Sequence, residues 1–337
     1  MAQISVVWVG NPFFQSALAD CGWKVHHINP SREEVLTWDA IMASAGFVPD
    51  ILVVADKSQP PFVVGMERFP CLTAFYAVDT HIHSWYPHYA QAFDICLLSL
   101  RDHVPLFAGA RLTKETVWWS PPYANPKDVP VLPDPEKPFW DVLFLGTVNP
   151  DVSPQRSAFL DELAPLVPGL HVATSPNRAE MYAQAKIVLN HAVAGDLNFR
   201  VFEALGCGAC LVTPIVRHGF DLFFENGIDL FTYDQNDIPA LAKLLNALPN
   251  ATERCKKVAL HGHATVLAGH YMRHRAEAFA MQAIQLLASG KAAQLVAARL
   301  AEAKSIHNTW LKLLYLHHAE TAGNEALGAA YLKAARG

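Results

Sequence analysis

Short apolar runs of strand length alternate along most of the chain with longer segments in which apolar residues recur every three or four positions. This alternation is typical of a parallel α/β sheet, because strands covered on both faces are apolar throughout. In the first part of the chain the pattern predicts helices over 14–21 and 33–45, and strands over 4–9, 24–28, 51–55, 71–78 and 95–99.

The segment 121–138 contains a proline every few residues, which disfavours both helix and central strand. The α/β pattern then resumes, with strands expected over 140–145, 171–173, 187–190, 209–213 and 230–233, and helices over 156–166, 178–184, 199–205 and 238–248. From about residue 251 onward the pattern is helical. We therefore expect an N-terminal domain (1–120), a linker (121–138), a second domain (139–285) and a helical C-terminal segment (286–337).

The composition excludes several classes of protein. The chain has 337 residues, of which 52% are hydrophobic and 17% charged, so it is not a disordered protein. A net charge of −5 gives no basic field for nucleic acid or anionic lipid. No apolar run approaches the ~20 residues of a membrane span, and the start shows no signal peptide. Six scattered cysteines fit reduced thiols, so we expect a cytoplasmic protein.

The segment 189–214 carries the strongest candidate chemistry. A strand ends at Asn190, a glycine-containing loop follows, and a helix is expected to begin near Asn198. Asn198 fits an N-cap, and a helix N-terminus beside such a loop suits a diphosphate. Arg200 can oppose phosphate charge, and the Glu203 carboxylate can accept two ribose hydroxyl hydrogen bonds. A capped amphipathic helix with an internal Arg–Glu pair is the structural alternative.

This segment resembles the C-terminal signature of GT-B glycosyltransferases, and among them the spore-maturation-protein (CgeB)-like group of group 1 transferases. In that group an N-x-R-x-F-E-A-x-A/G-C-G block follows a strand that ends in Leu-Asn, and residues 198–208 read NFRVFEALGCG after Leu189-Asn190. Two more segments are similar: Phe144-Leu145-Gly146-Thr147 with Asn149, Pro150 and Arg156, and His270 with Arg275. The resemblance covers about residues 141–279.

The resemblance implies two Rossmann-like, doubly wound domains facing a cleft, with an all-helical segment at the C-terminus. It implies transfer of a sugar from a nucleoside-diphosphate sugar, expected to be a UDP-sugar, to an acceptor hydroxyl, with no tightly bound cofactor and no metal. The nucleobase would lie near 173–178 and the ribose on Glu203. The donor-binding residues would be Gly146, Thr147, Asn149, Arg156, Asn198, Arg200 and Glu203.

One position departs from the family pattern. Many retaining GT-B enzymes carry Glu-x7-Glu, and Gly195 stands where the first glutamate would be, with Asp196 beside it. Retention or inversion of the anomeric centre is therefore left open, as are the sugar, the acceptor and the oligomeric state.

Asp79, His81 and His83 follow the strand expected over 71–78 and are the catalytic candidates of the first domain. Asp79 can act as a base for an acceptor hydroxyl, and the histidines can bind donor phosphate or sugar. Alternate residues of an extended Asp-x-His-x-His segment can also bind a metal, which makes a metal-dependent hydrolase one alternative. A polar loop without chemistry is another, as is a non-catalytic GT-B-like nucleotide-binding or assembly module.

Other motifs are weaker. Gly10-Asn11-Pro12 is either a ligand-facing loop or a tight turn, and Cys207-Gly-Ala-Cys210 has CxxC spacing without a second cysteine pair. The histidines His261, His263, His270 and His274 lack the acid of a zinc hydrolase motif, so we expect surface or interdomain positions. The aromatic pairs Trp85-Tyr86 and Trp118-Trp119 are either a sugar platform or buried packing.

Overall fold

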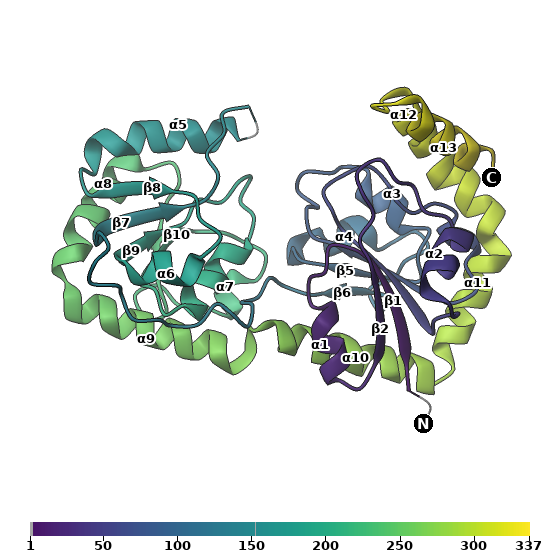
Figure 1. Ribbon diagram of the computed structural model, residues 1–337, viewed down its shortest axis with the longest axis horizontal. Helices are drawn as coiled ribbons and strands as arrows, with labels where there is room; N and C mark the ends of the chain where they lie inside the picture. The colour runs from purple at the N-terminus through teal and green to yellow at the C-terminus, as the bar shows by residue number, and fades with distance from the viewer. Residues whose placement is uncertain (1–2, 152) are drawn as a thin grey trace. The chain divides into compact units, whose positions relative to one another are not determined.

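The computed structural model describes residues 3–151 and 153–337 (Figure 1). It divides into two compact units. Unit 1 holds the chain up to Pro121 together with Arg275–Gly337, and unit 2 holds Pro122–His274. The chain therefore leaves unit 1, forms unit 2 and returns to unit 1.

This division differs from the expected domains. The chain changes unit at Pro121 and again at Arg275, whereas the second domain was expected to end at residue 285. The proline-rich segment belongs to unit 2 from Pro122 onward, and the helical segment 286–337 belongs to unit 1.

Unit 1 is built on a parallel sheet of six strands in the order β2-β1-β3-β4-β5-β6. The order reverses between β1 and β3, where Val7 lies opposite Leu52. In open sheets of this kind ligands bind at the carboxyl ends of the strands beside the reversal. The strands are β1 (Ser5–Gly10), β2 (Lys24–Ile28), β3 (Ile51–Ala55), β4 (Leu72–Ala77), β5 (Ile95–Leu98) and β6 (Val117–Trp119).

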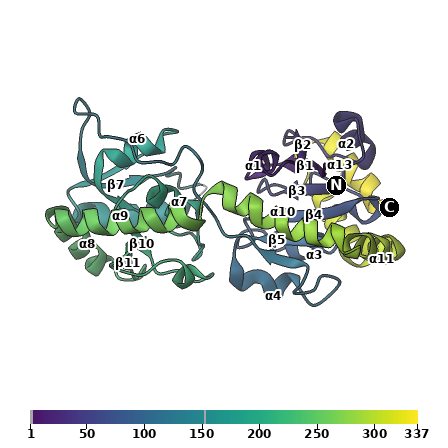
Figure 2. The ribbon, with the colours of Figure 1, turned by 90° about the horizontal axis from the view of Figure 1, so that it is seen from below.

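Helices from both ends of the chain cover this sheet. The early ones are α1 (Gln15–Asp20), α2 (Trp38–Ala45), α3 (Tyr86–Ala90) and α4 (Val104–Phe107), and the late ones are α10 (Met272–Ala288), α11 (Lys291–Ile306), α12 (Lys312–Glu320) and α13 (Glu325–Arg336). Figure 2 shows α10 running along unit 1. Its Phe279 ring packs against Phe14, Trp23 and Trp118 at centroid distances of 5.9, 5.8 and 6.1 Å.

Arg299 fixes α11 to unit 1 through a fully buried guanidinium. Its Nε donates to Asp94 Oδ1 at 2.9 Å, Nη1 donates to the Met66 carbonyl at 2.6 Å, and Nη2 donates to the carbonyls of Phe69 and Cys71 at 2.8 Å each. These bonds join the C-terminal helices to the short 3-10 helix Met66–Arg68 and to the start of β4.

Unit 2 is a parallel sheet of five strands in the order β11-β10-β9-β7-β8, with a reversal between β7 and β9. The strands are β7 (Trp140–Leu145), β8 (Leu170–Ala173), β9 (Ala185–Leu189), β10 (Leu211–Pro214) and β11 (Phe231–Tyr233). The helices are α5 (Pro154–Leu163), α6 (Arg178–Ala183), α7 (Phe199–Gly206), α8 (Ile238–Ala247) and α9 (Thr252–Gly269). No helix in the described part of the chain is long and apolar enough to cross a membrane.

The expected elements are present, although one expected helix is shorter and the short elements α3, α4 and β6 were not predicted. The helix predicted over 33–45 begins only at Trp38, because Leu36 exchanges backbone hydrogen bonds with Phe62 and Val64 and is held extended. The strand β6 was not predicted, because its three residues are too short a run to indicate a strand.

Candidate functional site

Arg200 lies in the first turn of α7, and its guanidinium reaches the carboxyl edge of the unit 2 sheet. Nη1 donates to Asn190 Oδ1 at 2.9 Å, and the group lies 5.2 Å from the centroid of the Phe144 ring. The buried Asn190 amide donates to the Thr213 hydroxyl, which turns its oxygen toward Arg200. A Cβ at Gly146 would lie 2.6 Å from Arg200 Nη2, so the glycine leaves room for the guanidinium.

Arg156 brings a second guanidinium to this edge from α5. Nη1 donates to the Thr147 carbonyl at 2.9 Å, and the buried Nε has no acceptor. Burial, and then Arg200, lower the pKa of Arg156. His191 follows β9, and burial together with the two guanidiniums lowers its pKa to about 4, so it is neutral at pH 7. The ion pairs found among the described residues include neither guanidinium.

Asn198 occupies the N-cap position of α7 with an extended backbone, but its side chain does not form the predicted capping bond. Its amide nitrogen instead lies 3.4 Å from Asn190 Oδ1 and 3.5 Å from the His191 carbonyl, and its buried Oδ1 accepts no hydrogen bond. The prediction failed because Asn190 Oδ1 attracts the donors of both Asn198 and Arg200. The first amides of α7 are therefore left uncapped by this side chain, as an anion site requires.

Glu203 lies one turn further along α7. It is paired with Arg178, and not with Arg200 as expected for a helix with an internal Arg–Glu pair. Its Oε1 is 3.3 Å from Arg178 Nη2, which is also 3.2 Å from Asp128 Oδ1. The pKa of Glu203 is raised to about 7, mainly by burial and to a smaller extent by Asp128, whereas Arg178 and Arg200 oppose the shift. The carboxyl group thus titrates near neutrality.

The other predicted donor residues shape the loop after β7. The Gly146 amide donates to the Ala173 carbonyl at 2.9 Å, and Asn149 Oδ1 accepts the Asp151 amide at 2.9 Å. Five of the predicted donor residues therefore lie at one edge of the sheet: Gly146, Thr147, Arg156, Asn198 and Arg200. Glu203 lies one helical turn away, and the Asn149 side chain bonds within its own loop. Donor binding by these residues stays a prediction.

A pocket of about 590 Å³ adjoins this edge and is lined by Phe159, His191 and Gln235 among others. Gln235 Nε2 donates to the Ala192 carbonyl at 3.0 Å and lies 3.0 Å from His191 Nε2, while His191 Nδ1 is buried without a partner. Sequence reasoning missed both residues, although a polar residue directly after a buried strand, as His191 is, could have drawn attention to it.

In unit 1 the buried Asp56, directly after β3, organises the carboxyl edge of the sheet. Its Oδ2 accepts the amides of Val78 and Asp79 at 2.9 and 2.7 Å, and its Oδ1 accepts the Ser58 amide at 2.6 Å and the Tyr86 hydroxyl. The loops after β3 and β4 are thereby tied to one carboxylate, which sequence reasoning did not single out.

The three predicted catalytic residues lie in the loop after β4. Burial and then Asp56 raise the pKa of Asp79, while a hydrogen bond from the Ser58 side chain lowers it. His83 Nε2 is 2.8 Å from Ser58 Oγ, and His81 has a buried Nδ1 without a partner. Their catalytic roles stay predictions.

The metal alternative finds no geometric support. The amides of Ile82 and His83 both donate to the Asp79 carbonyl, so residues 79–83 form a tight turn and not the extended segment on which that alternative depended. Among the described residues no group of histidine, cysteine or carboxylate side chains is arranged to hold a metal ion.

The later histidines are occupied within unit 2. His261 Nδ1 is 2.8 Å from Asp229 Oδ1, His263 Nδ1 is 3.2 Å from the Leu205 carbonyl, and His274 Nδ1 accepts the Tyr271 amide. The His270 ring packs against three phenylalanines, at positions 202, 223 and 224.

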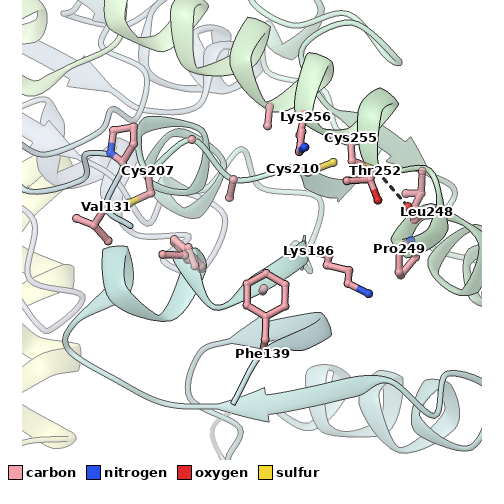
Figure 3. Close-up of a pocket in the computed structure, with 17 residues that line it drawn as sticks. Val131, Phe139, Lys186, Cys207, Cys210, Leu248, Pro249, Thr252, Cys255 and Lys256 are labelled. Carbon is pink, nitrogen blue, oxygen red and sulfur yellow. Dashed lines mark hydrogen bonds between the residues drawn. The ribbon is translucent and has the colours of Figure 1, made fainter. Parts of the chain in front are cut away.

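The cysteine motif lines a second pocket, of about 380 Å³, near the amino ends of β9 and β10 (Figure 3). Cys207, Cys210 and Cys255 are buried, and burial raises the pKa of each thiol. Lys186 and Lys256 of the pocket are paired with Asp141 and Glu253 respectively. Protonated, buried thiols fit packing and not redox chemistry.

The remaining motifs make packing contacts. A Cβ at Gly10 (φ +112°) would lie 2.0 Å from the Ala55 carbonyl oxygen, so the glycine allows close strand approach. The Trp118 indole is nearly buried, and the Trp119 indole donates to the Ser99 carbonyl. The Trp85 ring packs edge-on against Tyr86 at 4.5 Å.

A family profile described as glycosyl transferase-like matches residues 160–281. A search of curated proteins gave no match. Solved structures similar in fold include a sucrose-phosphate synthase from Thermosynechococcus elongatus, with a TM-score of 0.61 and 12% identity over 85% of this chain and all of that one. A glycosyltransferase from Rickettsia africae has a TM-score of 0.61 and 9% identity over 85% of this chain and 99% of its own.

Anabaena Alr3699/HepE, solved in complex with UDP-glucose, has a TM-score of 0.60 and 10% identity over 85% of this chain and 100% of its own. At these identities the likeness shows the fold, and two parallel sheets of six and five strands agree with it. The chain has the GT-B fold that its sequence predicts.

Proposed function

We propose that this chain is a glycosyltransferase that moves a sugar from a nucleoside-diphosphate sugar to an acceptor hydroxyl. The family profile over residues 160–281 and the GT-B fold support sugar transfer in general. The block over residues 198–208 supports the finer assignment to the CgeB-like group. UDP-glucose in the Anabaena relative supports a UDP-sugar as the donor to test first.

The observation that carries the proposal is the pair of guanidiniums at the carboxyl edge of unit 2. Arg156 and Arg200 converge there beside the start of α7, and Arg156 Nε is a buried donor with no acceptor. Like charges held together in a half-buried site favour an anion that neutralises both. A diphosphate provides that charge and the missing acceptors.

The leaving diphosphate gains negative charge as the anomeric bond breaks, so the same two guanidiniums would stabilise the transition state. Glu203 would accept hydrogen bonds from the ribose, next to a nucleobase near 173–178. In unit 1, Asp79, His81 and His83 would serve the acceptor hydroxyl.

Thermal unfolding against UDP, GDP, ADP and dTDP, with and without Mg²⁺ or Mn²⁺, tests this proposal. A ligand at ~100 times its dissociation constant adds about 2.7 kcal/mol, a shift of several degrees. We expect one diphosphate to raise Tm without metal, and the double variant R156A/R200A to lose that shift.

The variant K257A is the matched control, because it removes a positive charge from an exposed position of α9 and should keep the shift. If no diphosphate raises Tm, or if the double variant responds like the wild type, the donor site is wrong. Binding without hydrolysis or transfer of UDP-glucose would favour the non-catalytic module instead.

A further inference from the structure

Glu67 is a buried carboxylate of unit 1 with hydrogen-bonding capacity left over. The residue is 1% exposed and lies in the short 3-10 helix before β4. Its Oε1 is 3.4 Å from His307 Nδ1 and 3.7 Å from Arg68 Nε. Its Oε2 is buried and has no hydrogen-bond partner. A buried acceptor without a donor costs free energy, so this oxygen favours a molecule that brings a donor to it.

A cavity of about 580 Å³ adjoins Glu67, and its size is typical of small-molecule sites. It lies in unit 1 where the start of α2 meets the C-terminal half of α13 (Figure 2). Trp38 and Phe69 form an aromatic wall, with ring centroids 5.0 Å apart, and Val64 adds aliphatic surface. This wall suits a flat, apolar body. None of the described residues that line the cavity is a candidate catalytic or donor-binding residue.

The exposed rim of this cavity carries two cations, Arg68 and Lys333. Lys333 takes part in none of the ion pairs found among the described residues, and Arg68 pairs with Oε1 of Glu67 and not with Oε2. The two cations outnumber the one exposed carboxylate of the lining, Asp39. The rim therefore favours an anionic group on the ligand, which both cations can contact.

We propose that this cavity binds a small aromatic acid that carries a hydroxyl group. The hydroxyl donates to Glu67 Oε2, the ring lies on the aromatic wall, and the carboxylate lies beside the two rim cations. Such a ligand contacts α13 and the segment before β4 together. His307, which faces the other oxygen of Glu67, donates from Nε2 to the Ala335 carbonyl of α13 at 3.1 Å. The bound acid therefore adds to contacts that already hold α13 on unit 1.

Isothermal titration calorimetry of the full-length protein tests this site with three matched probes. We expect saturable binding of 4-hydroxyphenylacetate, and about tenfold weaker binding of phenylacetate, because phenylacetate cannot donate to Glu67. The uncharged 4-hydroxyphenylacetamide should also bind more weakly, because it lacks the carboxylate that the rim cations contact. No saturable binding of the hydroxy acid at millimolar concentration, or equal affinity for phenylacetate, would overturn the proposal.

Two variants place the binding in this cavity. A330W puts a large side chain into the cavity and should abolish binding, whereas A329W, at an exposed neighbouring position outside the lining, should bind as the wild type does. E67Q removes the charge of the acceptor and should weaken binding of the hydroxy acid by about tenfold, with little change for phenylacetate. Wild-type affinity in either A330W or E67Q would overturn the site.

A third variant keeps the test decisive if A330W or E67Q does not fold. K333Q removes an exposed rim charge and should weaken binding of the hydroxy acid but not of the uncharged amide. Its control K304Q, at an exposed position of α11 outside the lining, should leave both affinities unchanged. An equal response of the two variants would show that the acid does not bind at this rim.

Discussion

Glu203 makes the stability of unit 2 depend on pH. Its pKa is raised from 4.5 to about 7 in the folded chain. Below pH 4.5 the group is protonated whether folded or unfolded, so the stabilisation is complete. As pH rises toward 7 only the unfolded state loses the proton, and stability falls by as much as about 3 kcal/mol. We expect E203Q to lack this loss, measured by urea unfolding of both proteins between pH 4.5 and 8.

The control for this prediction is E253Q, at a carboxylate whose side chain is 89% exposed. It should follow the wild-type curve at every pH. Parallel curves for the wild type and E203Q would show that Glu203 does not titrate near neutrality.

For single residues, the sequence indicated which side chains carry the candidate chemistry better than it indicated which side chains they contact. The block over 198–208 singled out Arg200 and Glu203, but their partners are Asn190 and Arg178, which come from other elements. Asp56 and Ser58 were missed because their contacts with the loop after β4 join positions more than 20 residues apart. Spacing along the chain cannot indicate such contacts.

At the scale of helices and strands, the buried ion pair between α11 and the sheet of unit 1 predicts that one substitution strongly lowers the stability of unit 1. Arg299→Met leaves the fully buried Asp94 carboxylate without its cation. Removing one partner of a buried pair costs about 3–5 kcal/mol. We expect the urea unfolding transition of unit 1 to shift accordingly, and R299M/D94N to recover part of the loss.

The control K304M changes an exposed residue on the same helix and should stay within about 0.5 kcal/mol of the wild type. A shift of R299M no larger than that of K304M would show that α11 does not depend on this pair.

Element prediction succeeded for several strands. The strands β2, β3 and β7 have the predicted bounds, and of these β3 is an uninterrupted apolar run, whereas β2 and β7 include polar residues. The helix expected over 33–45 was predicted to begin too early. The apolar spacing of its first residues is also compatible with the extended backbone that Leu36 adopts beside Val63. Tertiary pairing decided the conformation there.

Considered as a whole molecule, unit 2 should fold without the rest of the chain. Its apolar core draws on residues between 142 and 259, and its two ends are joined by Ala124, whose amide donates to the His270 carbonyl. We expect the fragment 122–274 to unfold cooperatively and to keep the diphosphate response of the full chain, measured by circular dichroism and thermal shift. A fragment without cooperative unfolding would contradict this independence.

The division into units was only partly predictable. The prolines signalled the first crossing near Pro121, but nothing in the helical pattern after residue 251 shows where the chain returns. The return depends on contacts such as Phe279 with Trp23, which lie far apart in the sequence.

The discontinuous unit 1 has a consequence during synthesis on the ribosome. Asp94 is translated 205 residues before Arg299. At ~5–20 residues per second this interval lasts roughly 10–40 s. Throughout it the nascent N-terminal sheet lacks its C-terminal helices and the guanidinium that neutralises Asp94, while all of unit 2 emerges. Unit 2 can therefore complete its folding first, and the earliest part of the chain to leave the ribosome is the last to become stable.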